Sequence, residues 1–217
     1  CDGSMFAGDR DHDDDGDGED DRLYRGLANL SAALDVAKAE FPNPRRVVFA
    51  GSSGGGFGAI LNTPLVRHYY PEADLFVVAD GAVGVARGDL EPGMVTDLMD
   101  QFGAHAMLPD DCHECIAGGH LVPVVDWYLK RDPKVHFAVF SSWYDMIVGD
   151  VFLDIPPATF RDFVLATTDA VRAEHPERYR RFIVDGRAHT VLLGNASGII
   201  GDDIGAVELP EGILTKL

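Results

Sequence analysis

Short, continuous apolar runs recur along the chain and are the clearest feature of its pattern. They occupy residues 47–50, 75–79, 135–140 and 181–184. Runs of this length are typical of strands in a parallel sheet that is covered on both faces, because no alternation with polar residues is needed there. The pattern therefore predicts four buried strands.

The segments between these runs have the three- and four-residue periodicity of amphipathic helices. The longest example, which ends before Pro42, has apolar residues at Leu23, Leu27, Leu30, Leu34, Ala37 and Phe41. Further helices are predicted over 56–70, 121–129 and 159–174. We expect Asn62-Thr63-Pro64 to interrupt the first of these, because proline removes a helical hydrogen bond.

Strands and helices thus alternate, which predicts an α/β fold: a mostly parallel sheet with helices on both faces. The 217 residues are enough for a single domain with a sizeable core. Residues 84–130 interrupt the alternation with a mixed segment that contains Gly, Pro and Cys, and we expect a cap insertion there. In open parallel sheets, active sites lie at the carboxyl ends of the strands.

The composition narrows the range of partners. The formal net charge is -18, and such a surface repels nucleic acid and anionic membranes, so neither is an expected partner. No apolar run reaches the roughly 18 residues that a spanning helix needs, so we predict no membrane span. Abundant Asp with scarce Lys is typical of salt-adapted proteins and also of a high-GC coding bias, and both explanations stay open.

Three cysteines are present, Cys1, Cys112 and Cys115. The last two have the Cys-x-x-Cys spacing of a local disulfide, half a metal site or a redox pair. No second Cys-x-x-Cys completes a zinc site, and redox pairs normally lie at a strand-to-helix junction, so we predict a disulfide in a loop. Cys1 stands where a Met and a basic leader would begin, so we expect that upstream residues were removed or that the chain is a fragment.

Residues 8–22 form an acidic run. The spacing Asp-x-Asp-x-Asp-Gly over residues 11–16 matches the first half of an EF-hand calcium loop, and a second register is shifted by two residues. The twelfth position of that loop, normally a bidentate glutamate, is Arg22 in the first register and Tyr24 in the second. We therefore predict a solvated loop.

The most specific chemical signal is the segment 51–56, which directly follows the first predicted strand and reads Gly-x-Ser-x-Gly with Ser53 at its centre. Small residues allow a sharp strand-to-helix turn that exposes the serine hydroxyl. The first N–H groups of the next helix, including that of Gly54, point to where an oxyanion would develop. The segment therefore predicts a nucleophile together with part of its electrostatic support.

Glycine-rich turns after strands have other uses, and phosphate binding is one of them. A Walker loop needs Lys-Ser/Thr after its glycines, where Phe57-Gly58 stands here, and the spacing differs from the dinucleotide fingerprint Gly-x-Gly-x-x-Gly. A tight turn without chemistry is the remaining alternative.

A serine nucleophile needs a histidine base, and the histidine needs a carboxylate that holds its tautomer. In hydrolases with this kind of sheet, the order along the chain is serine, acid, histidine. Asp145 follows the third predicted strand and His189 follows the fourth. We therefore predict a triad of Ser53, Asp145 and His189.

Each member of this triad has an alternative. Asp80 also ends a strand, but one strand too early for the acid, and Asp145 also suits a helix cap. Ser52 precedes the apex of the turn. The other histidines are expected in the acidic run, the cap, the helices or the strands: His12, His68, His105, His113, His120, His136 and His175.

Several segments resemble those of the pectin acetylesterase / Notum family of carboxylesterases. Residues 51–58 resemble its elbow Gly-Ser-Ser-Ala-Gly-Gly-x-Gly, with Gly54 in place of the alanine. The start, Cys1-Asp2-Gly3-Ser4 with Gly8-Asp9, resembles its Cys-Thr-Gly-Asp segment. The helices before and after the elbow are also similar, at Tyr24-Arg25-Gly26, Ala32-Ala33-Leu34-Asp35, Phe41-Pro42 and Leu61-Asn62-Thr63-Pro64. The resemblance is good over residues 1 to about 82 and thinner afterwards.

The resemblance implies an α/β-hydrolase-like serine carboxylesterase with Ser53 as nucleophile, Asp145 as acid and His189 as base, and with the Gly54 N–H as an oxyanion donor. It implies a secreted enzyme that removes an acetyl or other acyl group from a carbohydrate or similar substrate, without cofactor or metal. The family carries strands and a Gly-rich oxyanion segment upstream, so we expect a partial domain without the N-terminal strands. The alternative is a non-catalytic binding module whose acidic run binds calcium or a cationic partner.

Overall fold

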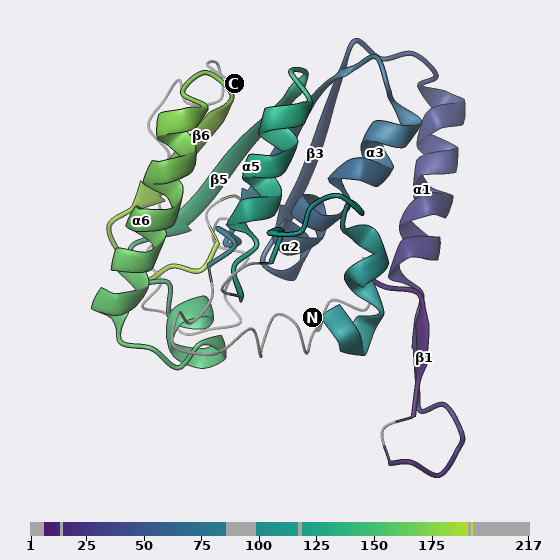
Figure 1. The fold of residues 1–217 in the computed structure, drawn as a ribbon, viewed down its shortest axis with the longest axis horizontal. Helices are drawn as coiled ribbons and strands as arrows, with labels where there is room; N and C mark the ends of the chain where they lie inside the picture. Colours follow the sequence, from purple (N-terminus) through teal and green to yellow (C-terminus); the bar gives the residue numbers. More distant parts are fainter. Residues whose placement is uncertain (1–6, 14, 86–98, 117–118, 191, 193–217) are drawn as a thin grey trace.

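The computed structural model describes residues 7–13, 15–85, 99–116, 119–190 and 192 (Figure 1). A four-stranded sheet consists of β3 (Arg46–Ser52), β4 (Asp74–Asp80), β5 (Val135–Ser142) and β6 (Tyr179–Val184). The helices that flank it are α1 (Gly26–Glu40), α2 (Gly54–Leu61), α3 (Thr63–Tyr69), α5 (Val122–Arg131) and α6 (Pro157–Glu174). The four predicted strands are thus present, and the chain has an α/β fold. The prediction that all four are buried is wrong for β3, whose residues are all exposed or half-buried because the strand lies at one end of the sheet order.

The four strands are all parallel and lie in the order β3-β4-β5-β6. In this register Ser52 lies opposite Asp80, and Asp80 lies opposite Phe140. Because the strands are parallel, their carboxyl ends lie at one edge of the sheet. The elbow after β3 and the loops after β4, β5 and β6 all begin at that edge.

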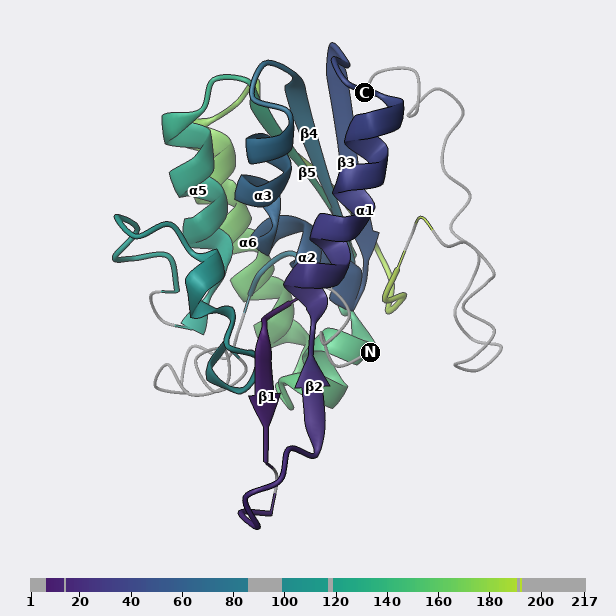
Figure 2. The same cartoon turned by 90° about the vertical axis from the view of Figure 1, so that its right-hand side faces the viewer.

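One face of the sheet and the five helices named above share one hydrophobic core. Its members include Leu75, Val77, Val135 and Phe137 from the strands, and Leu34, Ile60, Val66, Leu129 and Phe160 from the helices. Figure 2 shows α3, α5 and α6 on the same side of the strands. Burial of each aliphatic side chain of this core contributes roughly 1.5–3 kcal/mol, so this face stabilises the sheet whose strand ends carry the elbow and the loops.

The opposite face of the sheet carries a smaller apolar cluster of strand residues, in which Ala138 and Phe140 are buried. Val48, which points to the same side, is 67% exposed. Among the residues that the structure describes, no helix contributes to this cluster. The predicted second layer of helices therefore stays a prediction: continuous apolar runs show which faces of a strand can be buried, and they do not show what covers them.

Two helix boundaries differ from the sequence pattern. Leu23 belongs to the short strand β2 (Arg22–Tyr24) and is exposed, and Phe41 lies beyond the end of α1 and is also exposed. The leucine periodicity runs past both ends of α1, but the contacts with the core do not. The predicted interruption at Asn62 is confirmed, because α2 ends at Leu61 and α3 begins at Thr63.

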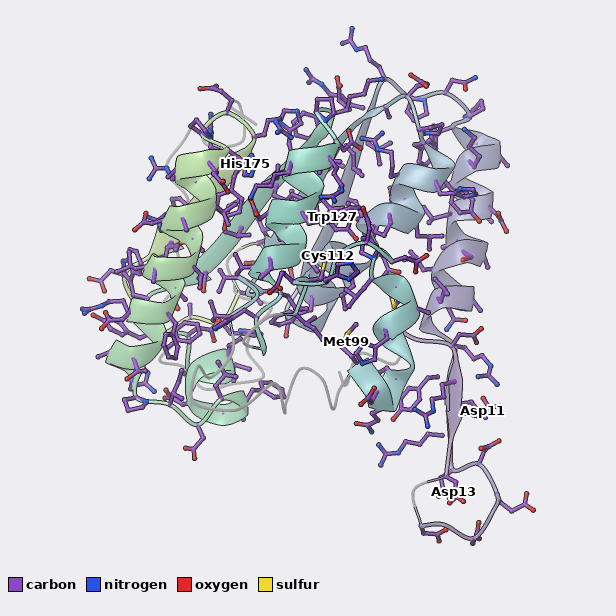
Figure 3. All side chains as sticks on the ribbon, viewed as in Figure 1. Asp11, Asp13, Met99, Cys112, Trp127 and His175 are labelled. Carbon is purple, nitrogen blue, oxygen red and sulfur yellow. A yellow bond between two sulfur atoms is a disulfide. The ribbon has the colours of Figure 1, made fainter. Side chains whose placement is uncertain are left out.

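The acidic run forms the loop of an antiparallel hairpin between β1 (Arg10–His12) and β2. Asp11 and Asp13 lie on this hairpin, at the far end of the molecule from His175 (Figure 3). The sequence did not predict the hairpin, because strands of three residues are too short for a periodic signal. Two strands flank the loop where an EF-hand has two helices, and residues 15–20 are exposed, which agrees with the predicted solvated loop.

The segment between β4 and α5 is only partly described. Val124 and Leu129 of α5 are fully buried in the main core. The cap insertion over residues 84–130 stays a prediction. Its described part contains a short 3-10 helix, η1 (Ala104–Met107), and a disulfide between Cys112 and Cys115. The predicted loop disulfide is thus confirmed, while Cys1 and residues 86–98 lie outside the described residues.

Within the described ranges, no helix is both long enough and apolar enough to cross a membrane.

Candidate active site

The turn between β3 and α2 holds Ser53 in an unusual backbone conformation, with φ 56° and ψ −126°. Such a conformation costs a non-glycine residue roughly 1–3 kcal/mol and persists only where its surroundings enforce it. Gly51 is part of that enforcement, because a Cβ there would lie 2.0 Å from the carbonyl oxygen of Gly55. Only glycine lets the end of β3 approach the first turn of α2 so closely.

Backbone hydrogen bonds fix this turn on both sides. The Ser53 N–H donates to the carbonyl oxygen of Asp80 on β4 at 2.7 Å. The Ser53 carbonyl in turn accepts from the N–H of Gly56 at 2.8 Å, in the first turn of α2. The hydroxyl of Ser53 therefore stands at the carboxyl edge of the sheet, at the N-terminus of a helix.

His189 comes from the far side of the sheet, because β4 and β5 lie between β3 and β6. The loop after β6 runs back along the end of β5, and three contacts hold it there. Backbone N–H groups of Tyr144 and Met146 donate to the carbonyls of Gly186 and Arg187 at 3.1 and 3.3 Å. The Ser142 hydroxyl donates to the carbonyl of Ala188 at 2.5 Å, directly before the histidine.

Ser53, His189 and Asp145 form one continuous chain of hydrogen bonds. The Nε2 atom of His189 lies 2.7 Å from Ser53 Oγ. Its Nδ1 atom lies 2.9 Å from Asp145 Oδ2 and 3.1 Å from Oδ1. Because a carboxylate only accepts, Nδ1 carries the proton that Asp145 binds, which leaves Nε2 free to accept the serine proton. The three residues predicted from chain order are thus brought together in the arrangement that a serine nucleophile needs.

Asp145 is held rigidly at the start of η3 (Met146–Phe152), a π-helical turn. Its Oδ1 atom accepts the N–H groups of Ile147 and Val148, both at 3.0 Å, so the same residue caps the turn and contacts the histidine. The side chain is only 1% exposed. Burial raises the pKa of Asp145, and the histidine and the two N–H groups oppose that rise.

The alternatives to these three residues have other partners. Asp80 is fully buried, and its Oδ2 accepts from the Ser52 hydroxyl at 2.9 Å and from the Leu192 N–H at 3.0 Å. Asp80 therefore does not occupy the position beside His189 Nδ1 that Asp145 fills. Ser52, in turn, donates to Asp80 and not to a histidine.

The described histidines outside this chain have structural or surface positions, and the side chain of His12 is outside the described part. His136 stacks on Phe76, and His105 pairs with the exposed Asp100. His120 meets Phe163 edge to face, and its partial burial lowers its pKa. His68 and His113 are exposed.

His175 takes part in a polar cluster that the sequence analysis missed. Its Nε2 lies 2.8 Å from Asp126 Oδ1, and Lys130 bridges Asp126 and Glu174 at 2.7 and 3.0 Å. The spacing of Asp126 and Lys130, four residues apart on one helix, was the available signal. Since the ammonium group already lies between the two carboxylates, this cluster ties α5 to the end of α6.

The acidic hairpin also gathers carboxylates, from Asp13, Asp15 and Asp21. Asp13 accepts the N–H groups of Gly16 and Gly18 at 2.7 and 2.8 Å. These bonds lower the pKa of Asp13. The carboxylate thus organises its own loop.

No protein-family model matches this chain, and no curated protein matches it.

Proposed function

We propose that this protein is a serine carboxylesterase. The observation that carries the proposal is the hydrogen-bonded chain from Ser53 through His189 to Asp145, at the carboxyl edge of a parallel sheet. Both the strained backbone of Ser53 and its position at the start of a helix suit a nucleophile that must be exposed and close to N–H donors. A turn without chemistry has no need of the histidine and the buried carboxylate.

In this mechanism the Ser53 hydroxyl attacks the acyl carbon of an ester while His189 Nε2 takes its proton. The Gly54 N–H donates to the oxyanion of the tetrahedral intermediate. His189 then returns the proton to the leaving alcohol, which breaks the ester bond and leaves Ser53 acylated. His189 then deprotonates a water molecule that attacks the acyl carbon; the bond to Ser53 Oγ breaks, the acid leaves, and His189 returns the proton to the serine. Asp145 stays ionised and stabilises the imidazolium.

The fold is consistent with an α/β-hydrolase-like domain of the pectin acetylesterase / Notum type. In that arrangement the acid follows the strand after next from the elbow and the histidine follows the last strand, as Asp145 and His189 do here. The resemblance of residues 51–58 favours acetyl or another small acyl group, carried on a carbohydrate or similar substrate. The disulfide Cys112–Cys115 supports an extracellular location, because disulfides persist in oxidising compartments.

The proposal is tested by hydrolysis of p-nitrophenyl acetate, measured at low and high salt for the wild-type protein and for Ser53→Ala. We expect Ser53-dependent turnover that falls to background in the variant, whose thermal unfolding should be unchanged. Ser31→Ala is a matched control, because Ser31 lies on α1 and its hydroxyl donates only within that helix, to the carbonyl of Leu27. A fluorophosphonate should label Ser53 in the wild type and in the control.

Turnover that survives in Ser53→Ala would show that the nucleophile is assigned wrongly. A folded wild-type protein with neither turnover nor labelling would instead favour the non-catalytic binding module, and calcium binding at the acidic hairpin would then be the next measurement.

A further inference from the structure

The loop that carries His189 must cross the carboxyl ends of two strands. It starts at the end of β6, yet the histidine must reach Ser53 at the end of β3, on the other side of β4 and β5. Among the described residues, the contacts with the end of β5 reach as far as Ala188. A second anchor beyond His189 is needed to hold the imidazole over the serine, because a loop fixed at one end can swing about it.

Asp80 is placed to be that anchor. It ends β4, directly beside Ser52 in the register of the sheet, and its side chain is fully buried. Its Oδ2 atom accepts the backbone N–H of Leu192, three residues after His189, at 3.0 Å. The same oxygen accepts the hydroxyl of Ser52, the neighbour of the nucleophile, at 2.9 Å.

The backbone around Asp80 makes the same two connections. Its carbonyl oxygen accepts the N–H of Ser53 at 2.7 Å, so one residue binds the elbow through both backbone and side chain. The next residue, Gly81, has φ +66°, and a Cβ there would lie 2.6 Å from the carbonyl of His189 and about 3.1 Å from its ring. The histidine loop therefore lies directly on the end of β4.

We propose that Asp80 is a positioning residue that couples the nucleophile elbow to the histidine loop, and so sets the alignment of Ser53 with His189. This inference rests on the proposed esterase function and adds a residue to it. Asp80 does not contact the reacting atoms. It acts through Ser52, the neighbour of Ser53, and through Leu192, three residues after His189, and the hydrogen bonds from both converge on its Oδ2 atom.

Two pairs of variants test the coupling. Asp80→Ala removes the acceptor, and Asp80→Asn keeps one side-chain oxygen that can accept both bonds. Ser52→Ala removes only the hydrogen bond between the elbow and the Asp80 side chain, and Ser52→Thr keeps the hydroxyl that donates it. Ser52→Ala is the milder change, and it keeps the inference testable where Asp80→Ala does not fold.

For p-nitrophenyl acetate we expect kcat to fall in both alanine variants, by up to about 100-fold for Asp80→Ala, because small misplacements of reacting groups cost rates of this order. KM should change little, since no group that holds substrate is removed. Asp80→Asn and Ser52→Thr should recover most of the rate. In Asp80→Ala, the further change Ser52→Ala should have little added effect, because the bond it removes is already lost.

Crystal structures of the wild type and of Asp80→Ala supply a readout that does not need activity. We expect the contact of 2.7 Å between Ser53 Oγ and His189 Nε2 to open beyond hydrogen-bonding distance in Asp80→Ala and to stay closed in Asp80→Asn. Folded alanine variants with wild-type kcat and an intact contact would overturn the inference. A wild-type protein without Ser53-dependent turnover would refute the esterase proposal, and the crystal comparison would still decide the role of Asp80.

Discussion

Asp145 experiences two opposing influences in one side chain. Its burial disfavours the charged form and raises the pKa, while His189 and two backbone N–H groups favour the carboxylate. A carboxylate in this position is costly for the fold and useful for the proposed chemistry. Activity and stability should therefore respond in different directions when its charge is removed.

We expect Asp145→Asn to reduce kcat by about 10⁴-fold, the effect of the equivalent change in other serine triads. The Asn oxygen can still accept the N–H groups of Ile147 and Val148, which leaves the amide NH₂ to face His189. Since the amide donates to Nδ1, the ring proton moves to Nε2, which then cannot accept from Ser53. Steady-state hydrolysis of p-nitrophenyl acetate measures the loss, and near-wild-type turnover would remove Asp145 from the triad.

The same variant should gain stability relative to the wild type as the pH rises. The pKa of Asp145 is higher in the folded protein than its ordinary value of 3.8, so the folded state binds the proton more tightly than the unfolded state. Its favourable contribution is therefore complete below pH 3.8 and is lost as the pH rises through the folded pKa. Urea unfolding of both proteins at about pH 4 and pH 7 measures the difference, and a gap that does not change with pH would contradict this account.

The junction between β3 and α2 requires a residue without a Cβ atom at position 51. Gly51 and Gly55 are both glycines of the elbow, but only Gly51 has a neighbour where a Cβ would stand. The contact is with the backbone carbonyl of Gly55, so a side chain at residue 51 must push the strand and the helix apart. The strained conformation of Ser53 depends on that close approach.

We expect Gly51→Ala to destabilise the fold by about 1–3 kcal/mol, the usual cost of overpacking, and to abolish serine labelling. Gly55→Ala is the matched control, because a Cβ there meets nothing within 4 Å. Alanine also favours helix over glycine by roughly 0.5–1 kcal/mol, so this control should unfold at the same temperature or a higher one. Thermal unfolding of both variants is the measurement, and equal melting temperatures would rule out the steric argument.

Acidic residues outnumber basic ones in this chain, and several of them lie on the acidic hairpin. The acidic hairpin extends from the end of the molecule at which the sheet strands finish (Figure 1). At the opposite end, where the strands begin, basic and acidic residues are both present and pair with each other, as Lys134 does with Glu72. With a net charge of -18, the folded chain is destabilised by its own repulsion.

We therefore expect the melting temperature to rise with NaCl, and most of the gain to come below about 0.5 M, because the screening length falls from roughly 10 Å at 0.1 M to roughly 3 Å at 1 M. Asp17→Asn with Glu19→Gln removes two charges from the hairpin and should reduce the salt dependence. A melting temperature that rises only above this range would point to general salting-out instead. One that does not change would show that repulsion is unimportant here.

The sequence by itself determined the type and order of the four sheet strands and of the helices between them, and the identity of the residues gathered at the carboxyl edge of the sheet. This was possible because buried parallel strands are continuously apolar, and because the order of Ser53, Asp145 and His189 follows from which strand each one ends. The sequence also predicted the helix break at Asn62 and the disulfide, because both depend on residues that are close together in the chain.

Only the tertiary structure decided the role of Asp80, the hairpin and the packing of one sheet face. Asp80 and Asp145 look alike in sequence, because each stands at or just after the end of an apolar strand. The fold gives the two carboxylates different partners: Asp80 contacts Ser52 and Leu192, and Asp145 contacts His189. Such contacts join residues more than 25 positions apart, and local patterns carry no information about them. The sequence thus predicted which chemical groups gather at the site, and the tertiary structure decided which of them contact each other.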